Sequence, residues 1–177
     1  MKEYFLLLFL LPLLFYNCEA QDGNEKFPSS NSSPLDTQSK LDSLVLEIAT
    51  HNKVEKAFIG KAALPSKQWK RYEQLKKIAT MDQMVALTKH ENPAVRCYAF
   101  QSLANKKSDQ VFPILLSHLQ DTAFVFARNG CFTGNVHVRD YFIAVVLPKH
   151  MEFMQLDAYN LSKKERKIVD SLLTQLK

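Results

Sequence analysis

The chain has 177 residues and carries 23 Lys and Arg against 18 Asp and Glu, a net charge of +5. This length predicts one domain. Eighteen of the basic residues are Lys and five are Arg, whereas proteins that read nucleic acid depend on Arg interleaved with aromatic residues. The Lys are interpreted as a solvated surface, so we expect no nucleic-acid partner. Attraction to anionic lipid or to an acidic partner stays open as a weak bias.

Residues 1–17 have the features of a secretory signal peptide. A basic start precedes an apolar run, Tyr4–Tyr16, which is shorter than the roughly 20 residues of a transmembrane helix. Two processing routes stay open. Cleavage after Ala20 would release the protein, whereas lipidation of Cys18 would anchor it to a membrane as a lipoprotein. We favour lipidation because a polar stretch suited to a tether follows Cys18. Both routes predict an exported protein.

Residues 18–40 are polar and rich in Ser, Asn and Pro, which predicts a flexible linker. Apolar residues recur at helical spacing afterwards, so we assign the folded domain to 41–177. A first helix is expected near 38–50. The segment 54–65 is interrupted by Gly and Pro, and its pattern gives no assignment.

Three helix starts follow, each marked by capping residues. Ser66 precedes a helix that continues to Ile78. Thr80 and Gln83 have the spacing of a capping box. Asn92-Pro93 combines a cap with Pro at the first helical position, which predicts a helix over 93–104.

The remaining segments are also interpreted as helices and loops. A helix is expected over about 109–119, and the apolar segment 136–147 follows a loop over 129–135. Ser162 and Glu165 form another capping-box spacing before a final helix. No segment shows sustained alternation with period two, so the predicted fold class is all-α.

A short pattern recurs along the domain at an offset of 43 residues, within the ~40–47-residue period of helical repeat arrays. The recurring residues are Val95, Arg96 and Tyr98, matched by Val138, Arg139 and Tyr141. One helix pair cannot cover its own apolar face, so stacking a second pair on it would close a core.

Residues 92–103, beginning Asn-Pro-Ala-Val-Arg and ending in Leu, resemble the second helix of a HEAT repeat. More loosely, the chain is similar to uncharacterised HEAT-like envelope proteins of the Bacteroidetes type. The resemblance implies a short α-solenoid of stacked helical hairpins with an interaction role and no catalytic residues. In such a stack Arg96 and Arg139 would pair with an acidic corner residue, Glu91 or Asp121.

The sequence contains no recognisable catalytic or metal-binding motif. Its five histidines do not fall at spacings of three or four residues, and no nucleophile elbow or phosphate loop occurs. We therefore expect no enzyme activity, no cofactor and no metal. The histidines are His51, His90, His118, His137 and His150.

The segment 122–135 is the candidate binding element, because aromatic residues and Arg are the usual anchors of protein interfaces. The alternative is a loop that packs its aromatic residues over the helices. The predicted partner-binding residues are Phe124, Phe126, Arg128 and Phe132.

Cys97 and Cys131 are left as a pair once Cys18 is lipidated or removed. They either form a disulfide, as an oxidising compartment would allow, or stay apart as a core residue and a loop residue.

These observations predict a non-catalytic interaction scaffold of the cell envelope that binds an unidentified protein partner. The alternative is a HEAT-like enzyme accessory or lyase-type protein. That alternative would need an invariant polar cluster on the concave face, and joint invariance of His118, Asp121, Cys131 and His137 among relatives would favour it.

Overall fold

The structure, a computed structural model, describes residues 34–156 and 159–175. The predicted signal peptide over 1–17, the cleavage position at Ala20, the lipidation site Cys18 and the linker before residue 34 lie outside the described residues. Residues 32–177 form one compact unit. Its single hydrophobic core runs from Leu41 to Val169, so this part of the chain has a complete core of its own.

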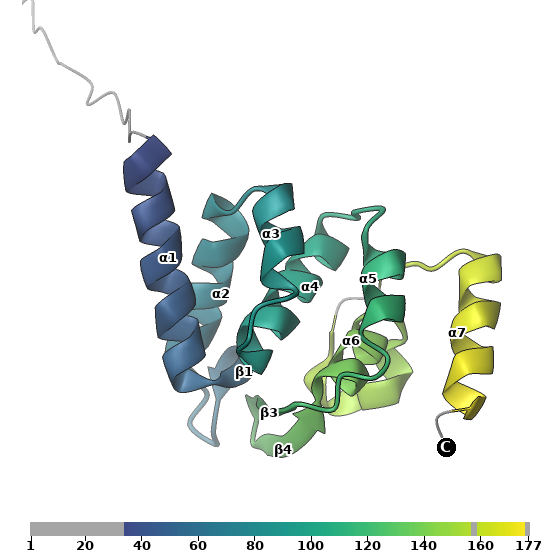
Figure 1. Ribbon diagram of the computed structural model, residues 1–177. Helices are drawn as coiled ribbons and strands as arrows, with labels where there is room; N and C mark the ends of the chain where they lie inside the picture. The colour runs from purple at the N-terminus through teal and green to yellow at the C-terminus, as the bar shows by residue number, and fades with distance from the viewer. Residues whose placement is uncertain (1–33, 157–158, 176–177) are drawn as a thin grey trace, which may run out of the picture. The chain divides into compact units, whose positions relative to one another are not determined.

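The described residues form eight helices and four strands, which makes the fold mixed α/β (Figure 1). In chain order these are α1 (Pro34–His51), β1 (Lys53–Ile59), β2 (Leu64–Pro65), α2 (Lys67–Ile78), α3 (Met81–Leu87), α4 (Pro93–Asn105), α5 (Val111–Ser117), β3 (Phe124–Gly130), β4 (Phe132–His137), α6 (Val138–Val146), the 3₁₀ helix η1 (Pro148–Met154) and α7 (Lys163–Gln175).

The three predicted helix starts are confirmed. The Ser66 hydroxyl accepts a hydrogen bond from the Trp69 amide at 2.9 Å, and Thr80 and Gln83 exchange both bonds of a capping box. The Asn92 side chain accepts from two amides of α4. These bonds satisfy backbone donors that a helix start leaves unpaired.

Helix α4 lies at the centre of the core. Every residue from Ala94 to Ala104 is buried, as expected for a helix that neighbours cover on all sides. It packs against α1, α2, α3, α5 and α6, and also against β1 and β3. The Tyr98 hydroxyl accepts a 2.8 Å hydrogen bond from the Glu55 amide, which joins this central helix to β1.

The four strands form one mixed sheet in the order β2-β1-β3-β4. β1 and β3 are parallel, whereas the outer pairs are antiparallel hairpins. Figure 1 shows the sheet beneath the helices, where it closes one end of the helical layer. Val54, Val125 and Ala127 are buried and belong to the same core as α4.

The sheet shows that the predicted all-α fold, a short α-solenoid, is wrong. The sequence did not predict these strands because apolar and polar residues do not alternate in them. In β3 the helix-facing Val125 and Ala127 are interleaved with Phe124 and Phe126 on the other side. The segment 129–135, interpreted as a loop, contains Asn-Gly, a pair that strongly favours hairpins.

The described helices also differ from expectation at the start of the domain. Helix α1 begins at Pro34, so it includes the last residues of the predicted linker. Its buried residues are Leu41, Leu44, Val45 and Ile48. Within residues 34–156 and 159–175, none of the helices is both long and apolar enough to cross a bilayer.

Candidate functional site

The side of the sheet turned away from the helices carries three of the predicted partner-binding residues. Phe124, Phe126 and Arg128 alternate along β3, so their side chains share one face. We call this surface the outer face. Phe124 is 61% exposed and Phe126 is 38% exposed. Phe126 pairs with Lys53 of β1 and Asn135 of β4, so these rings stand on an interior strand.

Phe124 is supported by a neighbour on β4. His137 is paired with Phe124 in the antiparallel register, and the two rings stack with centroids 4.2 Å apart. The His137 ring is itself positioned by a 2.7 Å contact between its Nδ1 and the carbonyl of Thr122. The exposed Phe124 ring therefore has a fixed support, which lowers the entropy lost when a partner covers it.

Arg128 lies beside the buried carboxylate of Glu55, at paired positions of β3 and β1. Glu55 accepts a 2.6 Å hydrogen bond from Ser66 and lies 3.6 Å from the Lys53 ammonium. Its Oε1 and the Arg128 Nε are nevertheless buried without a hydrogen-bond partner among the described residues. Because unpaired buried polar atoms cost free energy, the Glu55–Arg128 position is a costly one inside the sheet.

Phe132 does not belong to the outer face. It pairs with Asn129 next to the turn, and directly paired residues lie on the same side of a sheet. The register therefore puts Phe132 on the opposite side from Phe124, Phe126 and Arg128. It is 67% exposed at the tip of the hairpin, where it forms a separate apolar projection.

The repeat-motif residues have structural roles that differ between the two copies. Arg96 is buried in α4 and binds Asp121 with two bonds, Nε to Oδ2 at 2.9 Å and Nη2 to Oδ1 at 3.0 Å. Its Nη1 also donates to the carbonyls of His90 and Glu91. Of the two acidic partners predicted for Arg96, Glu91 and Asp121, its side chain therefore pairs with Asp121. Arg139 instead approaches its neighbour Asp140 at 3.6 Å.

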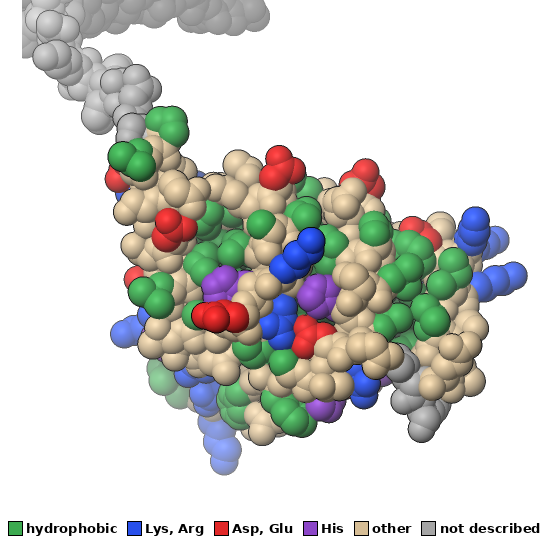
Figure 2. Space-filling model, viewed as in Figure 1, with side chains coloured by type: hydrophobic (Ala, Val, Ile, Leu, Met, Phe, Trp, Pro, Cys, Tyr) green, Lys and Arg blue, Asp and Glu red, His purple; other side chains and the backbone are tan. Residues whose placement is uncertain are grey.

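Asp121 is held in its ionised form by this pair. Desolvation by burial acts to raise its pKa, but hydrogen bonds from Arg96 and His118 outweigh it and leave the pKa below its ordinary value. Figure 2 shows charged and histidine side chains gathered in the middle of one face, between α3 and α5. The buried Val95 and Val138 complete the two copies of the motif as core residues.

The four polar residues considered for a lyase-type protein are not all brought together. The His118 Nδ1 lies 3.1 Å from Asp121 Oδ2, so these two do meet. His137 and Cys131, however, lie on the β3–β4 hairpin, where His137 stacks on Phe124 and Cys131 is exposed. Among the described residues no group of three or more His, Cys, Asp and Glu could hold a metal ion.

Both described cysteines are free thiols, so the disulfide considered for Cys97 and Cys131 is not formed. Cys97 is a buried residue of α4, and Cys131 is exposed at the turn between β3 and β4. Burial raises the pKa of the Cys97 thiol well above its ordinary value. The structure matches the other alternative, a core residue and a turn residue.

A cleft that the sequence did not indicate lies between α6, η1 and α7. It has a volume of about 410 Å³, and Asp140 lies 3.7 Å from the His150 ring on its wall. The side chains come from three elements, and no motif marked them. The lining residues are Arg139, Asp140, Ile143, His150, Asp170, Leu173 and Thr174.

No protein-family model, curated protein or solved structure matches the chain. The resemblance of residues 92–103 to a HEAT repeat stays a prediction. A function must therefore be inferred from the geometry of the described residues, in which the outer face is the most distinctive surface.

Proposed function

We propose that the protein is a non-catalytic scaffold that binds a protein partner through the outer face of its sheet. The observation that carries this proposal is the pair of exposed Phe rings on β3, an interior strand. Antiparallel sheets with one solvated face usually present polar residues there, whereas exposed apolar patches mark interaction sites. Aromatic residues and Arg, as in Phe124, Phe126 and Arg128, are frequent anchors of interfaces.

The neighbouring edge of the sheet supports the same proposal. β4 ends the strand order, and an edge strand offers backbone groups to which a partner strand can add. A groove of about 560 Å³ runs beside it, lined by Asn135–His137 of β4, Lys149–Phe153 of η1 and Phe124. An extended segment along β4 could place side chains in this groove and against the Phe rings.

The affinity available from the two rings is moderate. Complete burial of a Phe side chain is worth roughly 1.5–3 kcal/mol, and both rings are already partly covered. Covering the remainder of Phe124, which is 61% exposed, would therefore contribute about 1–2 kcal/mol, and covering the remainder of Phe126, which is 38% exposed, about 0.5–1 kcal/mol. Together these gains correspond to roughly 10- to 100-fold in affinity.

The proposal includes export and membrane anchoring through Cys18, which together would put the scaffold at the cell envelope. Mass spectrometry of the mature protein tests this part. A mass that includes a lipid on Cys18 supports anchoring, whereas a chain that starts at Gln21 contradicts it.

Selection of peptides from a displayed library tests the binding surface even though the partner is unidentified. We expect enriched extended peptides to bind the wild-type protein at least tenfold more tightly than the variant Phe124→Ser/Phe126→Thr. The control Leu46→Ser removes an exposed apolar residue from α1 and should bind like the wild type. Failure to enrich any peptide, or equal binding to all three proteins, would overturn the proposal.

A further inference from the structure

The positive charge of the chain is concentrated in one segment. Residues 53–77 contain eight Lys and Arg against two Glu, a net charge of +6. The whole chain carries +5, so all other residues together carry −1. The segment comprises β1, β2 and α2, which are consecutive in the chain and adjacent in the fold.

Three of these basic residues form a row on α2. Lys67, Lys70 and Lys77 are spaced by three and seven residues and are all exposed, so they follow one face of the helix. We call this row the lysine stripe. Because an α-helix rises about 1.5 Å per residue, the lysine stripe is about 15 Å long. The opposite face of α2 is buried through Tyr72 and Leu75.

The lysine stripe is not neutralised by neighbouring acidic groups. Arg71 pairs with Glu47 at 2.7 Å and Lys76 pairs with Glu73 at 2.9 Å. Within the described part of the chain, none of the three stripe residues forms an ion pair. Their ammonium groups are therefore free to meet negative charge outside the molecule.

An apolar projection lies at the start of the lysine stripe. The β1–β2 hairpin exposes 57% of Phe58 and 60% of Leu64, with the exposed Lys61 between them. Gly60 turns the chain with a φ of +73°, a conformation that suits Gly. The register puts Phe58 and Leu64 on opposite sides of the hairpin beside this turn, and we call these two residues the apolar tip.

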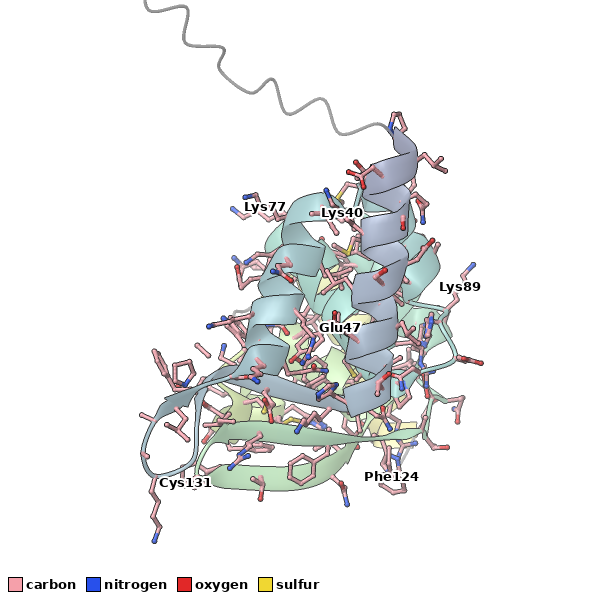
Figure 3. The ribbon with its side chains drawn as sticks, turned by 90° about the vertical axis from the view of Figure 1, so that its left-hand side faces the viewer. Lys40, Glu47, Lys77, Lys89, Phe124 and Cys131 are labelled. Atoms are coloured by element: carbon pink, nitrogen blue, oxygen red, sulfur yellow. The ribbon has the colours of Figure 1, made fainter. Side chains whose placement is uncertain are left out.

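The second hairpin extends this projection. The Gly60 amide donates a 2.8 Å hydrogen bond to the carbonyl of Gly130, so the two hairpin turns lie side by side. The exposed Phe132 follows the second of these turns in the chain. Figure 3 shows the β1–β2 hairpin projecting below α2, close to the labelled Cys131 and on the same side of the molecule as Lys77.

We propose that the lysine stripe and the apolar tip dock the domain onto the surface of an anionic lipid bilayer. Large apolar side chains at a projecting turn can enter the boundary between headgroups and acyl chains. Lysines beside them meet the anionic headgroups and keep their charge in water while their stems cover apolar surface. An acidic protein would satisfy the lysines, but it gives no reason for a projecting tip of Phe and Leu.

This docking surface is separate from the proposed partner-binding face. The apolar tip and the lysine stripe belong to β1, β2 and α2, whereas Phe124, Phe126 and Arg128 lie along β3. The two proposals can therefore fail independently, because each depends on residues that the other does not use.

Vesicle flotation of residues 32–177 tests the proposal. This part has its own core and omits the apolar run Tyr4–Tyr16, which would bind lipid by itself. We expect binding to vesicles of phosphatidylcholine mixed with phosphatidylglycerol, little binding to phosphatidylcholine alone, and weaker binding at higher salt.

Two variants and matched controls locate the surface. Each lysine near an anionic membrane contributes about 1 kcal/mol, so Lys67→Gln/Lys70→Gln/Lys77→Gln should weaken binding roughly 100-fold. Gln has nearly the helix propensity of Lys, so α2 should stay intact. The control Lys163→Gln/Lys164→Gln/Lys167→Gln removes the same charge from α7 and should bind like the wild type.

The apolar tip is tested by Phe58→Ser/Leu64→Ser, which should also lose most binding, with Leu46→Ser as the exposed apolar control. Equal losses from the α2 and α7 variants would overturn the proposal, since net charge alone would then explain binding. So would binding that does not depend on Phe58 and Leu64. Equal affinity for soluble polyglutamate, without need of the apolar tip, would assign the surface to an acidic protein and would also overturn it.

Discussion

Replacing Arg96 by Met should destabilise the protein far more than the same replacement at Arg139, the matching residue in the second copy of the recurring pattern. Met keeps most of the length of the Arg side chain but removes the guanidinium. In the wild type this group makes two bonds to Asp121 and two to backbone carbonyls, at 2.7–3.0 Å. The substitution removes two hydrogen bonds from a largely buried carboxylate, which keeps the amide of Ala123 as a donor, and one hydrogen bond from each of two carbonyls.

The expected cost follows from this geometry. Removing one partner of a buried ion pair typically costs about 3–5 kcal/mol, which in a domain of this size lowers the melting temperature by roughly 10–15 °C. Among the described residues the Arg139 guanidinium has one ion pair, with its neighbour Asp140 at 3.6 Å. Pairs of this kind contribute about 0–1 kcal/mol, so Arg139→Met serves as the matched control.

Urea unfolding followed by circular dichroism and by the fluorescence of Trp69 measures both variants. Trp69 suits this purpose because it is the single Trp and its ring lies 4.8 Å from that of Tyr72. A double-mutant cycle with Asp121→Asn should give a coupling energy of about 1–3 kcal/mol. Equal destabilisation by Arg96→Met and Arg139→Met, or a coupling energy near zero, would refute the reasoning.

The ion pair between Arg96 and Asp121 also makes the stability of the folded protein depend on pH. The pKa of Asp121 is lowered in the folded protein, so its contribution is fully present above its ordinary pKa of 3.8. That contribution is lost as the pH falls through the lower folded value. In Arg96→Met the acid-side loss should become smaller, because the guanidinium that held the pKa down is absent. If the loss of stability at acid pH were the same in Arg96→Met and in the wild type, Arg96 would not be the group that lowers the pKa of Asp121.

Three further predictions concern the core, a helix cap and the thiols. Phe142→Ala should cost about 3–5 kcal/mol, because this buried ring stacks on Phe100 with centroids 3.9 Å apart; a loss below 1 kcal/mol in urea unfolding would show that the site collapses around the gap. Thr80→Ala should cost about 1 kcal/mol, seen as a lower melting temperature, and an unchanged temperature would mean that the capping box adds nothing. In residues 32–177 a thiol reagent should modify the exposed Cys131 at once and Cys97 only on unfolding; rapid modification of both thiols would contradict the burial of Cys97.

The local signals in the sequence predicted much of the helical part. Thr80 and Asn92 marked helix starts that the structure confirms, because a cap acts through backbone groups only two or three residues away. The sheet was missed because its central pairing is not local. Glu55 and Arg128 meet at paired positions of β1 and β3, and neither segment alternates polar and apolar residues.

The candidate binding site was predicted in part. Phe124, Phe126 and Arg128 were selected by residue type and do share a face. Phe132 met the same criterion, but only the strand register reveals that it points elsewhere. The interpretation of the Lys residues as a solvated surface did not take account of the excess positive charge in residues 53–77, although this excess is visible in the sequence.

The parallel pairing of β1 with β3 also determines how the domain must be completed during synthesis. β1 ends at residue 59 and β3 begins at residue 124, so the inner edge of the first hairpin has no strand to pair with until four more helices have been made. Loop closure over so long a segment slows folding. A repeat array grows by adding whole units to a folded stack. In this domain, by contrast, β1 has no parallel partner until the β3–β4 hairpin has been synthesised. A nascent chain that stops before β3 therefore presents an unpaired strand edge, which invites association with other chains.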